Sequence, residues 1–248
     1  MTRKSLAIAA PVGSFKGAFA HGVLTALEEA GIVADAYAAA SSSVIPTSWA
    51  AIGRASNLGV DYWLAGLAAL QDPAQNMSKV VQRGIRVFSK QLLRASVQKD
   101  RSWVDTNLRF TLFSTHHPQP NHRITPNNFP AVAYASSRIM HAWELPAWID
   151  GQPYVDAAYT CLCPALAMVA AGYQETIAIA NEPGTMYQDM FHIEPIPTHS
   201  RGVPIHIIRP DVHLKELGVD FTKATPDGLV AVYRHGKDKG LEFIRKWK

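Results

Sequence analysis

The chain has little cysteine, no long apolar run and only a small excess of positive charge. Its two cysteines, Cys161 and Cys163, are too few for a disulfide framework, which favours a reducing, cytoplasmic location. No third or fourth ligand lies near this pair, so a metal site is not expected there. No apolar stretch reaches the roughly 18 residues needed to span a bilayer. The net charge of +4 gives no reason to expect a nucleic-acid partner, but it is compatible with a mild attraction to anionic lipid.

What the chain does have is the composition of a globular protein. Its 248 residues, 48% of them hydrophobic and 18% charged, suit a single domain over residues 1–248 with a sizeable core. The N-terminal segment has a superficial likeness to a signal peptide, because Arg3 and Lys4 precede an apolar run. Pro11 interrupts that run and Lys16 follows it, so we interpret the segment as a buried strand, a loop and a helix.

Apolar spacing predicts alternating strands and helices. The expected strands are Leu6–Ala10, Asp35–Ala39, Asn107–Ser114, Pro130–Ala135, Glu175–Ala180 and Pro204–Ile208, with a hairpin turn at Asp150-Gly151. The expected helices are Gly17–Ala30, a stretch to about Ile52, Pro164–Ala171, and Pro226–Trp247 with three weakening glycines. Residues 57–125 are expected to form a variable, helix-rich insertion. This order is the beginning of a layered α/β fold.

Three serines, Ser41 to Ser43, stand where the second strand meets the following helix, and the first two are candidate nucleophiles. A serine at such a turn fits a nucleophile elbow, since the turn lifts the hydroxyl above the sheet and the helix start faces developing negative charge. Small residues are needed two positions before and after the nucleophile. Ala39 and Ser43 satisfy this for Ser41, whereas Ser42 would place the β-branched Val44 there. We therefore favour Ser41, with Ser42 as the alternative; on these residues alone, either serine could simply cap the helix.

The first part of the chain carries a recognisable pattern. It reads Val12-Gly13-Ser14-Phe15-Lys16-Gly17 in the first loop, then Gly22-Val23-Leu24 and Leu27-Glu28-Glu29 in the helix. This resembles the patatin-like phospholipases, in which a glycine-rich loop ending in a basic residue and glycine precedes a Gly-x-Ser-x-Gly elbow. Alignment without a gap from Glu28 onward places the family's nucleophile on Ser41.

A second signature lies over a hundred residues later. It comprises Ala135-Ser136-Ser137, Ile149-Asp150-Gly151, Asp156-Ala157-Ala158 and Pro164. The family has an Ala-Ser segment, an Ile-Asp-Gly turn, and then Asp-Gly-Gly with a proline downstream. Its catalytic aspartate falls on Asp156. The resemblance covers residues 5–53 and 130–182 well, and 57–125 hardly at all.

The resemblance implies a patatin-like three-layer α/β/α sandwich with a central, mostly parallel sheet. It also implies a lipid acyl hydrolase that acts on lipid or other esters through a Ser41–Asp156 dyad, without a cofactor. Backbone amides of Gly13, Ser14 and Ser42 would form the oxyanion hole. Lys16 matches the family's basic residue and would help to hold the loop.

Several of the family's glycines are replaced here. The replacements are Val12, Ser14, Ala39, Ser43, Ala157 and Ala158, and an asparagine pair before the proline is Leu162-Cys163. Each replacement adds a Cβ where the backbone is expected to need positive φ or close approach. Two alternatives therefore stay open: a catalytically impaired patatin fold that binds lipids or partners, and an acyltransferase.

The segment 79–94 has two faces at helical spacing. Its apolar face consists of Val81, Ile85, Phe88 and Leu92, and its basic face of Lys79, Arg83, Arg86, Lys90 and Arg94. No acidic residue occurs from Met77 to Lys99. Such a helix either covers the core with its basic face in water or lies peripherally on an anionic membrane, and a lid over a lipid cleft would combine both.

The histidines give weaker signals. His116, His117 and His122 share a polar loop, but no carboxylate or cysteine is interleaved with them, so surface histidines are the better interpretation than a metal site. His141 or His192 could serve as the base of a histidine-containing triad, although no local pattern supports either.

Overall fold

The computed structural model describes residues 3–72, 74, 76–98, 107–110, 113–114, 122–123, 129–139, 145–149, 151–159, 161–191 and 193–247. Its centre is a seven-stranded sheet in the order β5-β3-β2-β1-β8-β10-β9. The parallel strands are β1 (Leu6–Ala10), β2 (Ala36–Ala39), β3 (Asn107–Phe110), β8 (Glu175–Ile179) and β10 (Val203–Ile208). Two-residue strands, β5 (His122–Arg123) and β9 (His199–Ser200), pair antiparallel at the edges.

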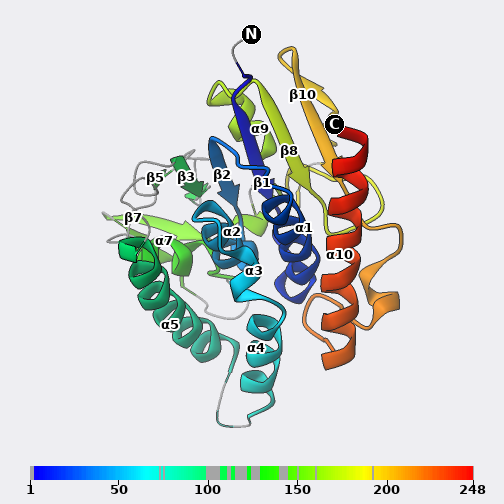
Figure 1. Ribbon diagram of the computed structural model, residues 1–248. Coiled ribbons are helices and arrows are strands. Elements are labelled where there is room, and N and C mark those ends of the chain that lie inside the picture. The colour runs from blue at the N-terminus through cyan, green and yellow to red at the C-terminus, as the bar shows by residue number, and fades with distance from the viewer. Residues whose placement is uncertain are drawn as a thin grey trace.

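Helices cover both faces of this sheet (Figure 1). One face packs against α1 (Gly17–Glu29), α2 (Val44–Ala51) and α10 (Pro226–Trp247), and the other against α9 (Ala165–Ala170). The side chains of β1 alternate between the two faces of the sheet. Leu6 and Ile8 pack in the core beneath α1, whereas Ala7 packs with Met168 of α9. The fold is therefore the three-layer α/β/α sandwich with a mostly parallel sheet that the sequence predicted.

The helices α1 and α10 pack unusually closely. A Cβ added to Gly236 would lie 2.1 Å from the carbonyl oxygen of Phe19, and one added to Gly22 would lie 2.1 Å from that of Tyr233. The glycines of α10 were expected only to weaken the helix. Gly236 and Gly240 are buried against α1, so their cost in helix propensity is offset by backbone contact that no larger residue allows.

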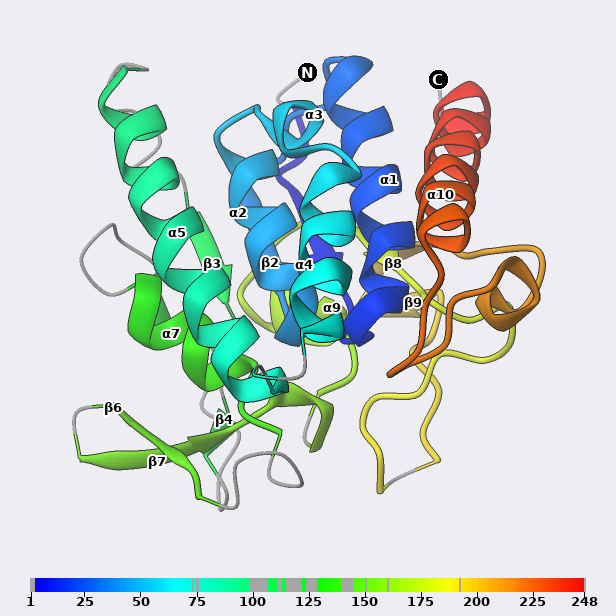
Figure 2. The same cartoon turned by 90° about the horizontal axis from the view of Figure 1, so that it is seen from below.

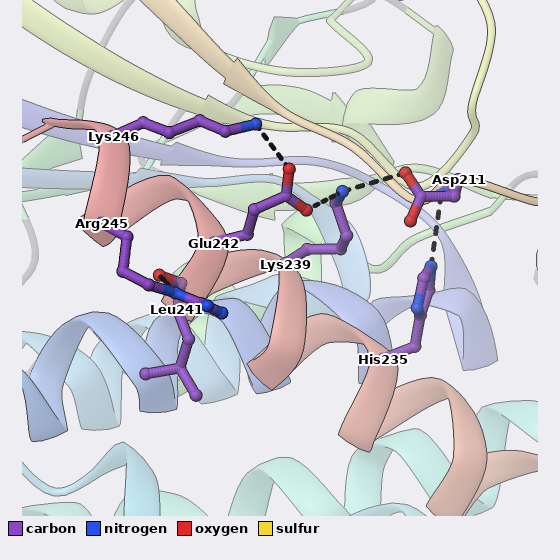
Figure 3. Close-up of polar contacts among 7 residues, drawn as sticks. All are labelled: Asp211, His235, Lys239, Leu241, Glu242, Arg245 and Lys246. Carbon is purple, nitrogen blue, oxygen red and sulfur yellow. Dashed lines mark hydrogen bonds and ion pairs between the residues drawn. The ribbon is translucent and has the colours of Figure 1, made fainter.

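Polar contacts tie the segment after β10 to α10 (Figure 3). Lys239 bonds to Asp211 at 2.9 Å and pairs with Glu242, which also accepts a 2.6 Å bond from Lys246. The backbone N–H of Asp211 donates to Nε2 of His235 at 3.2 Å. Exposed ion pairs of this kind add little stability. They do fix where the chain leaves β10, before it passes η4 (Leu214–Leu217).

A second group of helices stands beside α2. It comprises α3 (Ala55–Leu58), α4 (Asp61–Gln71), α5 (Met77–Gln98) and α7 (Phe129–Ser136), and Figure 2 shows α4 and α5 flanking α2. The predicted insertion over 57–125 is thus helical in much of its described part. Among the described residues, no helix is both long and apolar enough to cross a bilayer.

Two expected strands were wrong. Pro130–Ala135 belongs to helix α7, because a short apolar run cannot distinguish a buried strand from a buried helix. Alanines at every second position and a proline in the first turn favour the helix. Asn107–Ser114 is not one strand: β3 joins the large sheet, and β4 (Phe113–Ser114) joins a second sheet.

The second sheet is antiparallel and has the order β4-β7-β6. The strands β6 (Ala147–Ile149) and β7 (Gln152–Val155) form the predicted hairpin. Its turn contains Gly151 with a φ of 74°, a conformation that favours glycine; Asp150 lies outside the described residues. The hairpin leads β7 directly into Asp156 and the short η3 (Ala157–Tyr159).

Candidate active site

The candidate site lies at the carboxyl ends of β1, β2 and β8. In open α/β sheets, ligands bind at this edge, where the strand order reverses around the first strand. Here β1 has β2 on one side and β8 on the other, so the reversal occurs at β1. The loop with Gly13 and Ser14 follows β1, Ser41 follows β2, and Asn181 and Glu182 follow β8.

Ser41 starts η2 (Ser41–Ser43) and is held in a strained conformation. Its φ is 53°, in the left-handed region that a residue with a side chain rarely occupies. Its backbone N–H donates to Oγ of Ser136 at 2.9 Å, and Ser136 is wholly buried in α7. Its own hydroxyl donates to Oδ2 of Asp156 at 2.7 Å. This is the sharp turn between strand and helix that the sequence predicted around the serine.

Asp156 is fully buried, and its carboxylate accepts two hydrogen bonds. The backbone N–H of Ala158 donates to Oδ1 at 2.8 Å, and Ser41 donates to Oδ2. Burial raises the pKa of Asp156 to about 7, with both hydrogen bonds opposing the rise. A carboxyl group with a pKa near neutrality is a much better proton acceptor than an exposed aspartate.

Ser42, the alternative nucleophile, lies elsewhere. Its Oγ is buried without a hydrogen-bond partner among the described residues. A Cβ added to Gly17 would lie 2.9 Å from this Oγ, so the Ser42 hydroxyl lies against the start of α1. Among the described residues, Asp156 is hydrogen-bonded to Ser41 and not to Ser42.

The loop after β1 presents free backbone donors. Within the described part of the chain, the N–H groups of Gly13, Ser14 and Ser42 have no hydrogen-bond acceptor. Nδ2 of Asn181 donates to the carbonyl of Val12 at 2.9 Å, and a Cβ on Gly13 would lie 2.3 Å from that nitrogen. Asn181 therefore fixes the loop at a point where only glycine fits.

Lys16 joins three loops at this edge. Its ammonium group pairs with Glu182 after β8, and lies 3.6 Å from Oδ1 of Asp220 in the segment after β10. The Lys16 side chain is largely buried, so these pairs are partly shielded from water. Its position agrees with the expected role of holding the loop.

The residues that replace the family's glycines introduce less backbone strain than the sequence suggested. Of the positions where a family glycine is replaced, only Ser14 has a positive φ, at 48°. A serine there costs roughly 1–2 kcal/mol. At the elbow, Ser43 has an ordinary helical φ, and its Oγ donates to the carbonyl of Pro11 at 2.5 Å. Ser14 is therefore the only replaced position with the positive φ that was one of the two reasons to expect glycine.

A cavity of about 790 Å³ opens beside Ser41. Ser14 and Ser42 line its inner end, and α4 and α5 supply much of the wall. The apolar lining includes Tyr62, Trp63, Leu70, Val81, Ile85, Phe88, Ile139 and Phe221. Tyr62 and Phe88 stack edge to face at 4.8 Å and join the two helices. An elongated apolar ligand fits such a cavity better than a polar one.

The helix α5 has the two faces that the sequence predicted, as far as its side chains are described. Val81, Ile85 and Phe88 line the cavity, whereas Lys79, Arg83 and Arg86 are exposed. The side chains of Leu92, Lys90 and Arg94 lie outside the description.

Sequence reasoning missed two residues that shape the site. Ser136 was noted only as part of a motif, and Asn181 was not singled out. A polar pair directly after the buried strand β8 was the available signal for Asn181; the partner of Ser136 depends on tertiary packing. His116, His117, His141 and His192 lie outside the described residues, as does the side chain of His122. Within the described residues, no group of histidine, cysteine and carboxylate side chains could hold a metal ion.

Two solved structures are similar to this chain at low identity. VipD from Legionella pneumophila superimposes with a TM-score of 0.48 and 11% identity, covering 98% of this chain and 67% of VipD. Human GIVD cytosolic phospholipase A2, solved with a methyl γ-linolenyl fluorophosphonate inhibitor, gives a TM-score of 0.48 and 12% identity. The match covers all of this chain, which spans 60% of the phospholipase chain. No protein-family model matches the chain, and neither does any curated protein sequence.

Proposed function

We propose that this protein is a patatin-like serine hydrolase that cleaves lipid esters through a Ser41–Asp156 dyad. The observation that carries the proposal is the 2.7 Å hydrogen bond from the Ser41 hydroxyl to the buried Asp156 carboxylate. Ser41 lies at the strand ends where open α/β sheets bind ligands, and it lines an apolar cavity. Asp156 follows β7 of the second sheet and reaches Ser41 from there. The sequence motifs around the two residues support the same assignment.

The chemistry needs one proton acceptor and no histidine. Oγ of Ser41 attacks the ester carbonyl while Oδ2 of Asp156 takes its proton. The tetrahedral oxyanion is held by the free amides of Gly13, Ser14 and Ser42. When the C–O bond breaks, Asp156 returns the proton to the departing alcohol. Water then attacks the acyl-enzyme and gives a proton to Asp156. The bond between the acyl carbon and Oγ of Ser41 breaks, Asp156 returns the proton to that Oγ, and the carboxylic acid leaves.

The shape and polarity of the cavity support a lipid substrate. Its volume suits an acyl chain, and the walls from α4 and α5 are mainly aliphatic and aromatic. Ser14, Ser41 and Ser42 together form one part of the cavity wall, and an ester carbonyl would lie at this end. We therefore assign the reacting ester to this end and the acyl chain to the space between α4 and α5.

The decisive experiment is covalent labelling with an alkyl fluorophosphonate. The proposal expects one adduct, on the peptide that contains Ser41, and no adduct in Ser41→Ala. Ser41→Ala should also lower kcat/KM on short p-nitrophenyl esters by roughly a thousandfold or more. Ser42→Ala is the matched control and should still be labelled. An adduct on Ser42 would move the nucleophile by one residue, and no adduct on any serine would refute the proposal.

A pH profile with Asp156→Asn sharpens the same test. The base must be deprotonated, so kcat/KM should rise with pH through the Asp156 pKa of about 7 and level off above it. In Asp156→Asn the amide oxygen can accept the Ala158 N–H, which turns the NH2 group toward Ser41 and removes the proton acceptor. This variant should fold and lose most turnover. Wild-type activity in it would exclude Asp156 as the base.

The strained serine in the oxyanion loop favours one alternative, an impaired enzyme that only binds lipid. Ser14 occupies a left-handed conformation at a position where the family has glycine. If that strain disturbs the oxyanion hole, Ser14→Gly should raise esterase activity. Adding an alcohol acceptor during these assays distinguishes hydrolysis from acyl transfer, because a transferase would yield the new ester.

A further inference from the structure

The exposed side of α5 carries positive charge without compensation. Lys79, Arg83 and Arg86 are exposed, and the sequence of α5 contains no acidic residue. Among the described residues, none of these three cations has an ion-pair partner. Some basic residues elsewhere differ: Lys16, Lys239 and Lys246 all contact carboxylates.

The opposite side of the same helix is a wall of the cavity. Val81, Ile85 and Phe88 point into it, while Tyr62 on α4 stacks on Phe88. The lining continues around the helix to Arg83 and Val87, which are both exposed. Asp72 at the end of α4 and Phe221 after η4 are exposed lining residues as well. Residues that line a cavity and also face solvent stand at its mouth. One side of the mouth, at Arg83 and Val87, therefore adjoins the basic face.

We propose that the basic face of α5 docks on a bilayer containing anionic lipid, with the cavity mouth toward that bilayer. This inference rests on the proposed function, because it names the surface from which the site takes its substrate. Charge complementarity supports it: unpaired cations along one helix face attract an anionic lipid surface, and each adds to the binding energy. The neighbouring exposed Val87 gives this face apolar contact area beside its charges.

Docking in this orientation gives the site a simple supply route. An acyl chain can pass from the bilayer to the space between α4 and α5 without crossing bulk water. Its ester end then reaches Ser41 at the inner end of the cavity. A water-soluble short ester needs no such route, so its hydrolysis does not depend on docking. This separation makes docking and catalysis independently testable.

The test compares vesicle binding with hydrolysis of a soluble ester, using the double variant Lys79→Gln/Arg86→Gln. Both residues are exposed and neither lines the cavity. Co-sedimentation is measured with phosphatidylcholine vesicles and with vesicles of phosphatidylcholine and phosphatidylserine. Losing two cations should weaken binding to the anionic vesicles by about 30-fold. Raising the salt concentration should weaken wild-type binding as well, because exposed charges are then screened.

The matched control is Lys4→Gln/Arg245→Gln, which removes the same charge at the opposite end of the molecule. Lys4 precedes β1 and Arg245 is in the last turn of α10, and both are exposed. This control should bind anionic vesicles nearly as wild type does, and both double variants should hydrolyse a soluble short ester normally.

Three outcomes would overturn the inference. They are equal wild-type binding to neutral and anionic vesicles, binding that does not respond to salt, and equal loss in the two double variants. If Ser41 proves unreactive while salt-sensitive binding through Lys79 and Arg86 remains, the proposed hydrolase fails and the docking surface stands.

Discussion

Two helix pairs in this fold contain glycine, and the glycines have opposite effects on packing. In one pair they allow close contact, and in the other they border a cavity. Between α1 and α10, a Cβ on Gly22 or Gly236 would overlap the backbone of the facing helix. Between α4 and α5, a Cβ on Gly66 or Gly84 would have nothing within 4 Å, and both residues line the cavity. The first pair of helices is in contact because its glycines lack side chains, whereas the second pair leaves a space.

The difference divides the molecule into a scaffold and a binding region. The α1–α10 pair packs backbone to backbone over the sheet, and α10 is linked to the segment after β10 (Figure 3). The α4–α5 pair is joined by the stacked rings of Tyr62 and Phe88 around an open cavity. We therefore expect ligand binding at the cavity between α4 and α5, where the side chains pack least completely.

The same substitution should have opposite effects in the two regions. Gly236→Ala places a methyl group against the backbone of Phe19, which cannot move aside unless the helices separate, so we expect a loss of about 3 kcal/mol. Gly84→Ala adds a methyl group in open space inside a helix, so we expect a gain of up to about 1 kcal/mol. Urea unfolding of both variants measures this. Equal effects in the two variants would show that the comparison is wrong.

His21 connects the two regions, and its protonation should destabilise both. It packs against Tyr233 of α10, its Nδ1 accepts from Trp63 of α4 at 3.1 Å, and its Nε2 therefore donates to Ala55 at 3.0 Å. Burial lowers the pKa of His21 from 6.5 to about 4. Between these values the unfolded chain binds a proton that the folded protein does not. The contribution of His21 to stability should therefore fall as the pH drops through this window, by about 3 kcal/mol in total. The raised pKa of Asp156 acts in the opposite direction over the same range, because the folded protein binds that proton before the unfolded chain does.

Urea unfolding at intervals from pH 7 to pH 4 measures this loss. The control is His21→Gln, which removes the titrating imidazole and keeps Asp156, so the stability of wild type should fall relative to that of the variant as the pH drops. If wild type and variant show the same slope, His21 is not the source of the pH dependence.

Filling the cavity should change chain-length preference. In Gly84→Leu, a side chain extends into the space between α4 and α5 without a clash at its Cβ. If the acyl chain occupies this space, kcat/KM on long-chain esters should fall about tenfold, the equivalent of roughly 1.4 kcal/mol. Hydrolysis of a two-carbon ester should hardly change.

Gly84→Ala serves as the matched variant for this measurement, because it changes helix propensity in the same direction and fills much less of the cavity. A uniform loss on short and long esters in Gly84→Leu would mean that the cavity is not the acyl site.

The sequence predicted the layered fold because its local signals agreed. Strand β1, helix α1 and strand β2 follow one another with short loops, and Gly31 ends α1 with a φ of 73°. The prediction failed at Pro130–Ala135, where a buried helix and a buried strand have the same apolar composition. It also failed to foresee that Gly236 makes a helix contact, since this depends on a partner far away in the chain.

The sequence could predict the candidate catalytic residues, but it could not predict the residues that hold them in place. Ser41 and Asp156 stand in local motifs, so their positions could be inferred. The hydrogen bond from Ser41 to Ser136, and the one from Asn181 to Val12, depend on packing between elements distant in sequence. The amphipathic pattern of α5 was visible, but whether its apolar face met the core or a cavity depended on where α4 lay.

The close pairing of α1 with α10 also has a consequence for the order of events during synthesis. Thr25 on α1 accepts a hydrogen bond from Tyr233 on α10, 208 positions later. The ribosome therefore exposes the largely apolar α1 well before its partner exists. At typical rates of about 5–20 residues per second, that interval lasts on the order of ten seconds or more. Throughout it, the apolar surface of α1 lacks its native partner, and the domain cannot complete its fold until α10 has emerged.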